Sequence, residues 1–257
     1  MFPKSAALMA LASLALLAGC NRKAAAPPDA PQTRQAESGY ATPPAVLKVT
    51  REGAGLRLTG RARPGAEVRL ASPSGAAMSA TADASGLWNL DLPPSPEGRI
   101  FGLSAMVGGR PVQAQGYILV TPQGPAAQLR AGAAALRLDP QTSPALGALD
   151  FDTTGAAIVS GIAPPSGLVF LKLDGRQIAE GRTDAAGHYA IAISHAIPRG
   201  RHVLDVSGDT FSNHATVEIA PPAPLVVGPM RLQVTLGGLR ADWLTPGGGL
   251  QSTILLD

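Results

Sequence analysis

Three histidines in the second half of the chain have the spacing that most suggests metal chemistry. His188, His195 and His202 follow one another at intervals of seven residues. Imidazole nitrogens are common zinc ligands, but a zinc site needs them to converge on one point. On an ideal strand an odd interval puts successive members on opposite faces, and the three lie on different expected elements. The pattern therefore predicts exposed strand and loop histidines and no metal site.

Two aspartates could instead offer carboxylate oxygens to a calcium ion. Calcium takes roughly six to eight oxygen ligands, and neither Asp83 nor Asp184 stands in an acidic cluster. Each is followed three residues later by a glycine, Gly86 or Gly187. An Asp side chain can bond the backbone two residues further on, and glycine adopts positive φ without a Cβ clash. We therefore predict that these four residues form structural turns.

Catalytic signatures are missing from the sequence. It contains no H-E-x-x-H, G-x-S-x-G or S-x-x-K pattern, which are common signatures of metalloproteases and serine-dependent hydrolases. The glycine run at residues 247–249 is not followed by Lys and Ser or Thr, and no helix is expected after it, so it does not read as a phosphate-binding loop. We predict a non-enzymatic protein without a cofactor.

The two turns belong to an internal repeat with an offset of 101 residues. Gly60–Ala105 aligns without a gap with the second copy, so that Trp88 matches Tyr189 and Leu90 matches Ile191. After each turn, apolar residues alternate with other residues, as in a strand with one buried face. Trp88, Leu90, Tyr189 and Ile191 are the predicted core residues. A repeat of this length predicts two domains with separate cores rather than a solenoid.

Short alternating segments separated by turn signals about every 8–12 residues are typical of antiparallel β-sandwiches. The predicted fold is all-β, with two tandem sandwiches and a C-terminal β-hairpin extension. The predicted boundaries are 45–122 for the first domain, 123–147 for a linker, 148–222 for the second domain and 223–257 for the extension.

The repeat resembles the bacterial Ig-like domains of surface and envelope proteins. The resemblance is carried by Gly60, the Pro64-Gly65-Ala66 turn, Val68, Leu70, Asp83, Gly86, Trp88 and Leu90. It implies an Ig-like sandwich, although transthyretin-like sandwiches share the turn and its aromatic residue. It implies little about function, because such domains act as spacers, adhesins and enzyme appendages.

The C-terminal stretch departs from the repeat. Two alternating segments flank a Pro246–Gly249 loop, after one leading strand. A lone hairpin is marginally stable in water, so this one should pack on a sheet or on a partner. Trp243 is accordingly the candidate docking residue, while the alternative is a hairpin that only extends a domain.

The N-terminus has the organisation of a secretion signal. Residues 1–19 combine Lys4 with a short apolar run. The run leads into Leu17-Ala18-Gly19-Cys20, which resembles the lipobox of bacterial lipoproteins. The resemblance implies cleavage before Cys20, the only cysteine, and its acylation, for example with palmitate. Several acyl chains together give stable membrane anchoring. Residues 20–44 are an Ala/Pro-rich tether predicted to be disordered. The resemblance to lipoproteins, in which an Asp after the cysteine favours retention at the inner membrane, implies that Asn21 favours the outer membrane, with the protein facing the periplasm.

Charge bears on the choice of partner. Removal of Lys4 with the signal leaves 20 of 21 basic residues against 18 acidic ones, a net charge of +2, so a nucleic-acid partner is not expected. The expected partners are the membrane, through Cys20, and an envelope protein or peptidoglycan. We expect a cell-envelope lipoprotein that acts as a structural or binding module. The alternatives are a carbohydrate- or peptidoglycan-binding module and an accessory subunit of an envelope enzyme or export complex.

Overall fold

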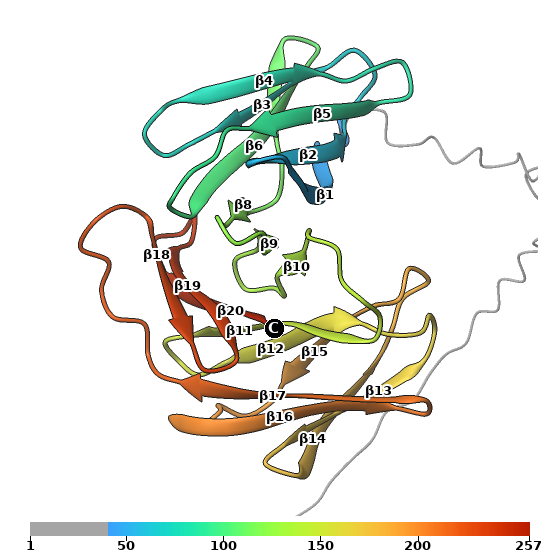
Figure 1. Ribbon diagram of the computed structural model, residues 1–257, viewed down its shortest axis with the longest axis vertical. Coiled ribbons are helices and arrows are strands. Elements are labelled where there is room, and N and C mark those ends of the chain that lie inside the picture. The colour runs from blue at the N-terminus through green and yellow to red at the C-terminus, as the bar shows by residue number, and fades with distance from the viewer. Residues whose placement is uncertain (1–40) are drawn as a thin grey trace, which may run out of the picture. The chain divides into compact units, whose positions relative to one another are not determined.

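The computed structural model describes residues 41–257, which form twenty β-strands and no helix (Figure 1). The predicted all-β class is therefore confirmed, and the strands pair antiparallel throughout this part of the chain. Within it, no helix has the length and apolar character needed to cross a membrane. The predicted signal, the lipidation site Cys20 and most of the tether lie outside the described residues.

The first copy of the repeat forms a sandwich of two sheets. Its strands are β1 (Ala45–Glu52), β2 (Gly55–Arg61), β3 (Glu67–Ala71), β4 (Ala77–Thr81), β5 (Leu87–Leu92), β6 (Arg99–Val107) and β7 (Arg110–Gln113). One sheet has the order β1-β2-β5, and in the other β4, β3 and β6 are neighbours, with β7 paired to β6. Leu58, Val68 and Leu103, all fully or almost fully buried, bring the two sheets together in one core.

The second copy repeats this order strand for strand. Its strands are β11 (Ala145–Asp152), β12 (Ala157–Ile162), β13 (Leu168–Leu173), β14 (Arg176–Arg182), β15 (His188–Ile193), β16 (Gly200–Gly208) and β17 (Phe211–Ile219). β15, β12 and β11 are neighbours in one sheet, and β14-β13-β16-β17 form the other. In the Ig-like arrangement, the first, second and fifth strands form one sheet, and it faces a second sheet that contains the third, sixth and seventh strands. In both copies the fourth strand pairs with the third.

In both copies of the repeat, a glycine lies opposite the aromatic residue that follows the turn. Gly60 lies across from Trp88 on the paired strands β2 and β5, and Gly161 lies across from Tyr189 on β12 and β15. A Cβ on Gly60 would come within 2.2 Å of the Trp88 ring, and one on Gly161 within 2.4 Å of the Tyr189 hydroxyl oxygen. Only glycine lets the ring lie flat over the neighbouring strand. Trp88 and Tyr189 are thereby held in their cores, 1% and 3% exposed.

The stretch expected as a linker is ordered and contains strands. β8 (Tyr117–Val120) pairs with β6, β9 (Ala126–Leu129) pairs with β8, and β10 (Leu136–Arg137) pairs with β9. The second sheet of the first sandwich is thus extended to β10, and β11 of the next sandwich begins at Ala145. Residues 121–144, called the bridging segment below, are therefore part of the folded structure rather than a flexible connection.

The C-terminal stretch is a part of the second sandwich. β18 (Met230–Thr235), β19 (Gly238–Leu244) and β20 (Leu250–Leu256) form an antiparallel meander. The last strand, β20, pairs with β11, with Leu149 opposite Ile254. The sheet therefore reads β15-β12-β11-β20-β19-β18. The expected hairpin with its leading strand exists, and it packs by continuing a sheet of the second sandwich, which is the alternative in which the hairpin extends a domain.

A third hydrophobic core lies between the two sandwich cores. It joins Ile100 and Leu119 of the first sandwich and Leu129 of the bridging segment to Ala148, Trp243 and Leu255 of the second sandwich. Tyr117 also packs here, with its ring edge-on to the Trp243 indole at a centroid distance of 6.0 Å. Residues 41–257 accordingly lie within one compact unit.

Candidate binding cleft

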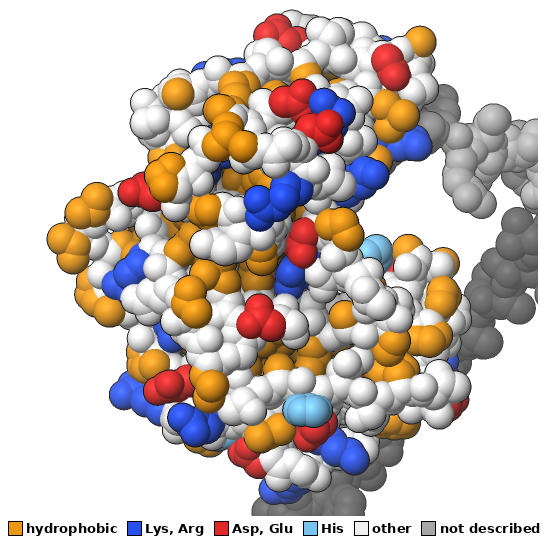
Figure 2. All heavy atoms as spheres, viewed as in Figure 1, with side chains coloured by type: hydrophobic (Ala, Val, Ile, Leu, Met, Phe, Trp, Pro, Cys, Tyr) orange, Lys and Arg blue, Asp and Glu red, His pale blue; other side chains and the backbone are white. Residues whose placement is uncertain are grey.

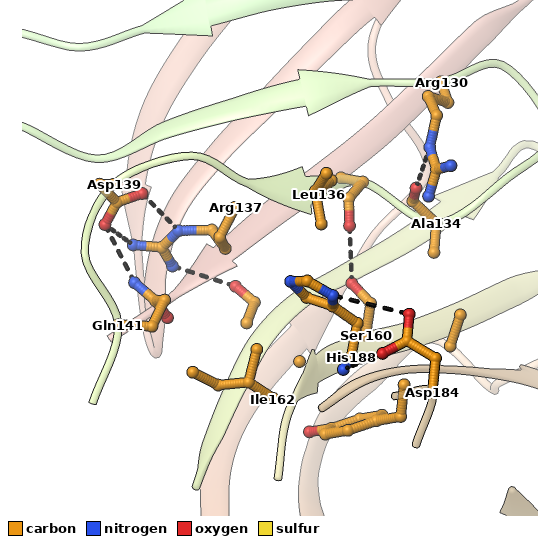
Figure 3. Close-up of a pocket in the computed structure, with 15 residues that line it drawn as sticks. Arg130, Ala134, Leu136, Arg137, Asp139, Gln141, Ser160, Ile162, Asp184 and His188 are labelled. Carbon is orange, nitrogen blue, oxygen red and sulfur yellow. Dashed lines mark hydrogen bonds and ion pairs between the residues drawn. The ribbon is translucent and has the colours of Figure 1, made fainter. Parts of the chain in front are cut away.

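A cleft of about 450 Å³ lies where the bridging segment passes over the second sandwich. One wall is the bridging segment around β10, and the other is formed by β12, β15 and the turn before β15. Figure 3 shows Arg137, Asp139 and Gln141 grouped on one side and Asp184 and His188 on another. The cleft is thus built from the bridging segment and the second sandwich.

Arg137 fixes the bridging wall. Its Nε and Nη2 atoms donate to the two Asp139 oxygens at 2.8 and 2.6 Å, a bidentate, charge-assisted pair. Its Nη1 atom donates to the carbonyl oxygens of Gly147, at 3.0 Å, and Leu256, at 2.8 Å. Gln141 donates to Asp139 Oδ2 at 3.0 Å. One guanidinium therefore ties β10 to β11 and β20 of the second sandwich.

The deep side of the cleft is held by a second set of bonds around Ala135. Its N–H donates to Asp150 Oδ2 at 2.6 Å, and its carbonyl accepts a hydrogen bond from Ser160 Oγ at 2.9 Å. Asp150 is 2% exposed. Burial raises the pKa of Asp150 to about 6, against the opposing effect of its hydrogen bonds from Ala135, Thr253 and Gln251. The wall of the cleft is therefore attached to a carboxyl group that titrates near neutral pH.

The mouth of the cleft carries the groups that a ligand can reach. Arg130 donates from Nε to the Ala134 carbonyl at 2.8 Å, which orients the guanidinium beside the cleft (Figure 3). His188 Nδ1 lies 3.7 Å from Asp184 Oδ2, and both side chains are about half exposed. The backbone N–H of His188 holds the pKa of Asp184 below its usual range. The mouth thus offers a cation, a carboxylate and an imidazole.

These groups are arranged for binding. Arg130, Gln141 and His188 can donate hydrogen bonds to a ligand, and Asp184 can accept them. The only hydroxyl groups among the lining residues are those of Ser160 and Tyr189, which donate to the Ala135 and Ala145 carbonyls. Neither hydroxyl is hydrogen-bonded to His188 in the part of the chain that the structure describes. The cleft can recognise a polar, charged molecule through fixed donors and acceptors.

The predicted turn residues form the same turn twice. Asp83 Oδ1 accepts from the N–H groups of Ser85 and Leu87, at 2.8 and 3.0 Å. Asp184 Oδ1 accepts from those of Ala186 and His188, both at 2.9 Å. The glycines that follow, Gly86 and Gly187, have φ values of 80° and 87°.

Of the residues singled out in the sequence, only Asp184, His188 and Tyr189 line the cleft. The predicted core residues Trp88, Leu90, Tyr189 and Ile191 are buried in the two sandwich cores. Sequence reasoning did not find Arg130, Arg137 or Asp139, because they lie in the stretch assigned to a linker. The one signal in the sequence that could have pointed to them is their charge. These three charged side chains lie within the ten residues 130–139, in a segment that otherwise consists mostly of small and apolar residues.

Trp243 is not a docking residue. It is completely buried, its indole N–H donates to Thr253 Oγ1 at 3.2 Å, and it packs in the third core. The proposal that it docks a partner is corrected on this point, because an indole enclosed between two sandwiches is not available to another molecule. Trp243 instead holds the two sandwiches together.

His188 and His195 are exposed as predicted, but His202 is buried, and the three histidines have separate partners. His202 bonds to Asp174 Oδ2 at 2.7 Å and to the Pro198 carbonyl at 2.9 Å, while His195 contacts Ser194 Oγ at 2.9 Å. Residues 41–257 contain no group of three His, Cys, Asp or Glu side chains placed to hold a metal ion.

Charges of both signs are scattered over the face seen in Figure 2, without a continuous basic field. A large field of one sign is the usual electrostatic footprint of a nucleic-acid-binding surface. The expectation of no nucleic-acid partner stays a prediction.

Comparison with known proteins finds similarity only to solved structures, at low sequence identity and low TM-score. No protein-family model matches the sequence, and none of the curated proteins matches it. Among solved structures, the central fibronectin-III array of RIM-binding protein is 11% identical, with 83% of this chain and 89% of that chain covered and a TM-score of 0.26. The BSP domain of a biofilm associated protein is 14% identical, with 70% and 30% covered and a TM-score of 0.25. At these TM-scores the likeness carries no argument about function.

Proposed function

We propose that this chain is a non-enzymatic, lipid-anchored module of the bacterial cell envelope that binds another envelope component in the cleft. The Ig-like sandwich is a structural or binding module in general terms, and the finer assignment rests on two features. One is the lipobox-like sequence that ends at Cys20. The other is the cleft beneath the bridging segment.

The observation that carries the proposal is the rigidity of the cleft wall. Arg137 ties the bridging segment to Gly147 and Leu256 of the second sandwich. Ala135 is bonded to Asp150 and Ser160 of the same sandwich. A pre-formed wall lowers the entropy cost of binding, and a spacer domain would not need one. The arrangement therefore favours recognition over simple spacing.

The groups at the mouth favour a ligand with carboxylates and amides. Arg130 suits a carboxylate, because guanidinium pairs with it through parallel hydrogen bonds. The two aromatic residues most suited to stacking on sugars, Trp88 and Trp243, are both buried. The cleft therefore suits a glycan that binds by stacking less well than it suits the peptide stems of peptidoglycan, which carry carboxylates and amides. Of the alternatives expected from the sequence, we therefore retain the peptidoglycan-binding module, with peptidoglycan as the proposed ligand of the cleft.

Calorimetric titration of soluble peptidoglycan fragments into the protein tests this proposal. Arg130→Gln should weaken binding by about tenfold or more, because a charge-assisted hydrogen bond is lost. The matched control is Arg199→Gln, which removes the same charge from an exposed loop residue outside the cleft. No binding by the unmodified protein would exclude peptidoglycan. An equal loss of affinity in both variants would exclude the cleft as the binding site for peptidoglycan.

A further inference from the structure

The first sandwich has a hollow of its own, of about 600 Å³, at the end where the described chain begins. Its lining includes Pro43, Leu47, Arg61, Arg63 and Val107, and it is called the entry hollow below. Among the described residues 41–257, no acidic residue lines it. Within residues 41–257, none of the ion pairs involves Arg61 or Arg63. The entry hollow therefore combines an apolar surface with two cations that have no acidic partner in that part of the chain.

Leu47 is turned outward by a defect in strand pairing. The register of β1 against β2 shifts between Val46 and Lys48, so Leu47 is the extra residue of a bulge. A bulge bends its strand and redirects a side chain. Leu47 is 49% exposed as a result. Its exposure follows from the backbone geometry and not from a loose loop.

The second copy shows what this face looks like when it is covered. Its register shifts at the same place, between Leu146 and Ala148, and the bulged residue is Gly147. Arg137 of the bridging segment donates to the Gly147 carbonyl, and residues 130–141 lie over this face as the wall of the cleft. In the second copy the preceding stretch of chain thus covers the face that the entry hollow occupies in the first.

The residues that differ between the copies are the ones that would contact a partner. At the bulge, Leu47 stands where the second copy has glycine, and Arg61 and Arg63 stand where it has Ile162 and Pro164. The first copy has therefore gained an apolar side chain and two cations on the face that the second copy closes with its own chain.

We propose that the entry hollow is the surface that this protein lays against an anionic phospholipid bilayer. The proposal rests on the lipid anchor of the proposed function. Arginine pairs with phosphate groups through its fork of donors, and basic side chains are drawn to anionic lipid surfaces. Leu47 and Val107 supply the apolar surface that buries between headgroups.

The distance along the chain supports the bilayer as the occupant. Only 24 residues separate Cys20 from Ala45. A segment of that length reaches at most about 85 Å when fully extended. A short tether of this kind gives an effective concentration in the millimolar range. Even a weak contact with the bilayer is then populated, so two arginines and one leucine are sufficient.

Tryptophan quenching by brominated lipids tests the proposal on the chain from Cys20 to Asp257, with a lipid coupled chemically to Cys20. The reporter is Leu47→Trp and its control is Val226→Trp, a position that is 94% exposed in the loop between β17 and β18. Trp88 and Trp243 are 1% and 0% exposed and give a constant background. Vesicles contain either phosphatidylcholine alone or phosphatidylcholine with about one third phosphatidylglycerol.

We expect quenching at Leu47→Trp at least twice that at Val226→Trp, and only on the anionic vesicles. Adding Arg61→Gln and Arg63→Gln should abolish the difference, as should molar salt. Equal quenching at both positions, or on both kinds of vesicle, would overturn the proposal. So would a blue-shifted emission from Leu47→Trp without vesicles, because the hollow would then be filled by residues 21–40 or by a second copy. Because the lipid is attached chemically, the result does not depend on acylation in the cell.

Discussion

Thr253 donates a hydrogen bond from Oγ1 to Asp150 Oδ1 at 2.6 Å, joining the last strand of the chain to the first strand of the second sandwich. Both residues are almost fully buried. The same carboxylate accepts from Ala135 of the bridging segment. One buried acid therefore links the bridging segment, the repeat and the C-terminal meander.

Asp150 should make the stability of the protein depend on pH. Its pKa in the folded state, about 6, lies above the ordinary value of 3.8. The folded state then binds more protons than the unfolded state between these values, so the free energy of unfolding falls as pH rises through about 6. Urea unfolding at pH 4.5 and 7.5 should show a decrease of a few kcal/mol from this group. Asp150→Asn should largely remove that decrease, and an identical pH profile in the variant would contradict the assignment.

Trp243 should control whether the two sandwiches unfold together. Trp243→Ala leaves a large cavity in the third core, at a cost of about 3–5 kcal/mol. We expect calorimetry to show two separated transitions in place of one, because the first sandwich keeps its own core. Trp88→Ala, which opens a cavity inside the first sandwich, is the matched control and should lower the stability of that sandwich. A single transition in Trp243→Ala would show that the third core does not couple them.

Gly187 should tolerate alanine much less well than a glycine with the same backbone angle. A Cβ at Gly187, with φ +87°, would lie 2.7 Å from the Ala163 carbonyl oxygen, whereas one at Gly175, with φ +81°, has no atom within 4 Å. Gly175→Ala should cost about 1–2 kcal/mol for the backbone alone. Gly187→Ala should cost about 1–3 kcal/mol more for the close contact. Equal losses in chemical denaturation would contradict the steric account of this turn.

Arg137 should not be replaceable by lysine. Arg137→Lys keeps the charge but cannot make the bidentate contact with Asp139 and still reach Gly147 and Leu256. We expect a loss of about 1–3 kcal/mol in unfolding free energy and faster hydrogen exchange in the bridging segment. Arg176→Lys, at an exposed residue that begins β14 and lies outside the cleft, should change neither quantity. Unchanged exchange in Arg137→Lys would show that the wall of the cleft is held by other contacts.

Cys20 should determine where the protein is found in the cell. Cys20→Ser removes the thiol that acylation requires, so the protein should move from the membrane fraction to the soluble fraction on cell fractionation. Retention of Cys20→Ser in washed membranes would mean that the protein is held there by something other than an acyl chain.

The repeat, the all-β class and the turns could be predicted because their signals are local. Asp83 and Gly86 are three residues apart, and the alternation that buries Trp88 and Leu90 is read within one strand. Such patterns specify the backbone conformation of the residues that carry them. The same local pattern then recurs 101 residues later, which supports each half of the interpretation.

The bridging segment and the meander could not be predicted in the same way, because their partners are distant in sequence. Residues 251–253 read as polar and suit an exposed strand, yet they are buried because Thr253 bonds to Asp150 and Gln251 to Gly132. Arg137 is in a short stretch with no clear period, and its acceptors lie on two other strands. Apart from the charged residues within 130–139, nothing local marks these contacts, so the cleft that they create could not be predicted from the sequence pattern.

Site-specific photo-crosslinking in intact cells tests most directly whether the protein binds an envelope component in the cleft. A photoreactive residue replaces Gln141, which lines the cleft, or Asp209, an exposed turn residue away from it. We predict a discrete adduct from position 141 that is absent from position 209 and disappears when Arg130→Gln is added. The same adduct from both positions, or no adduct from position 141, would contradict the account.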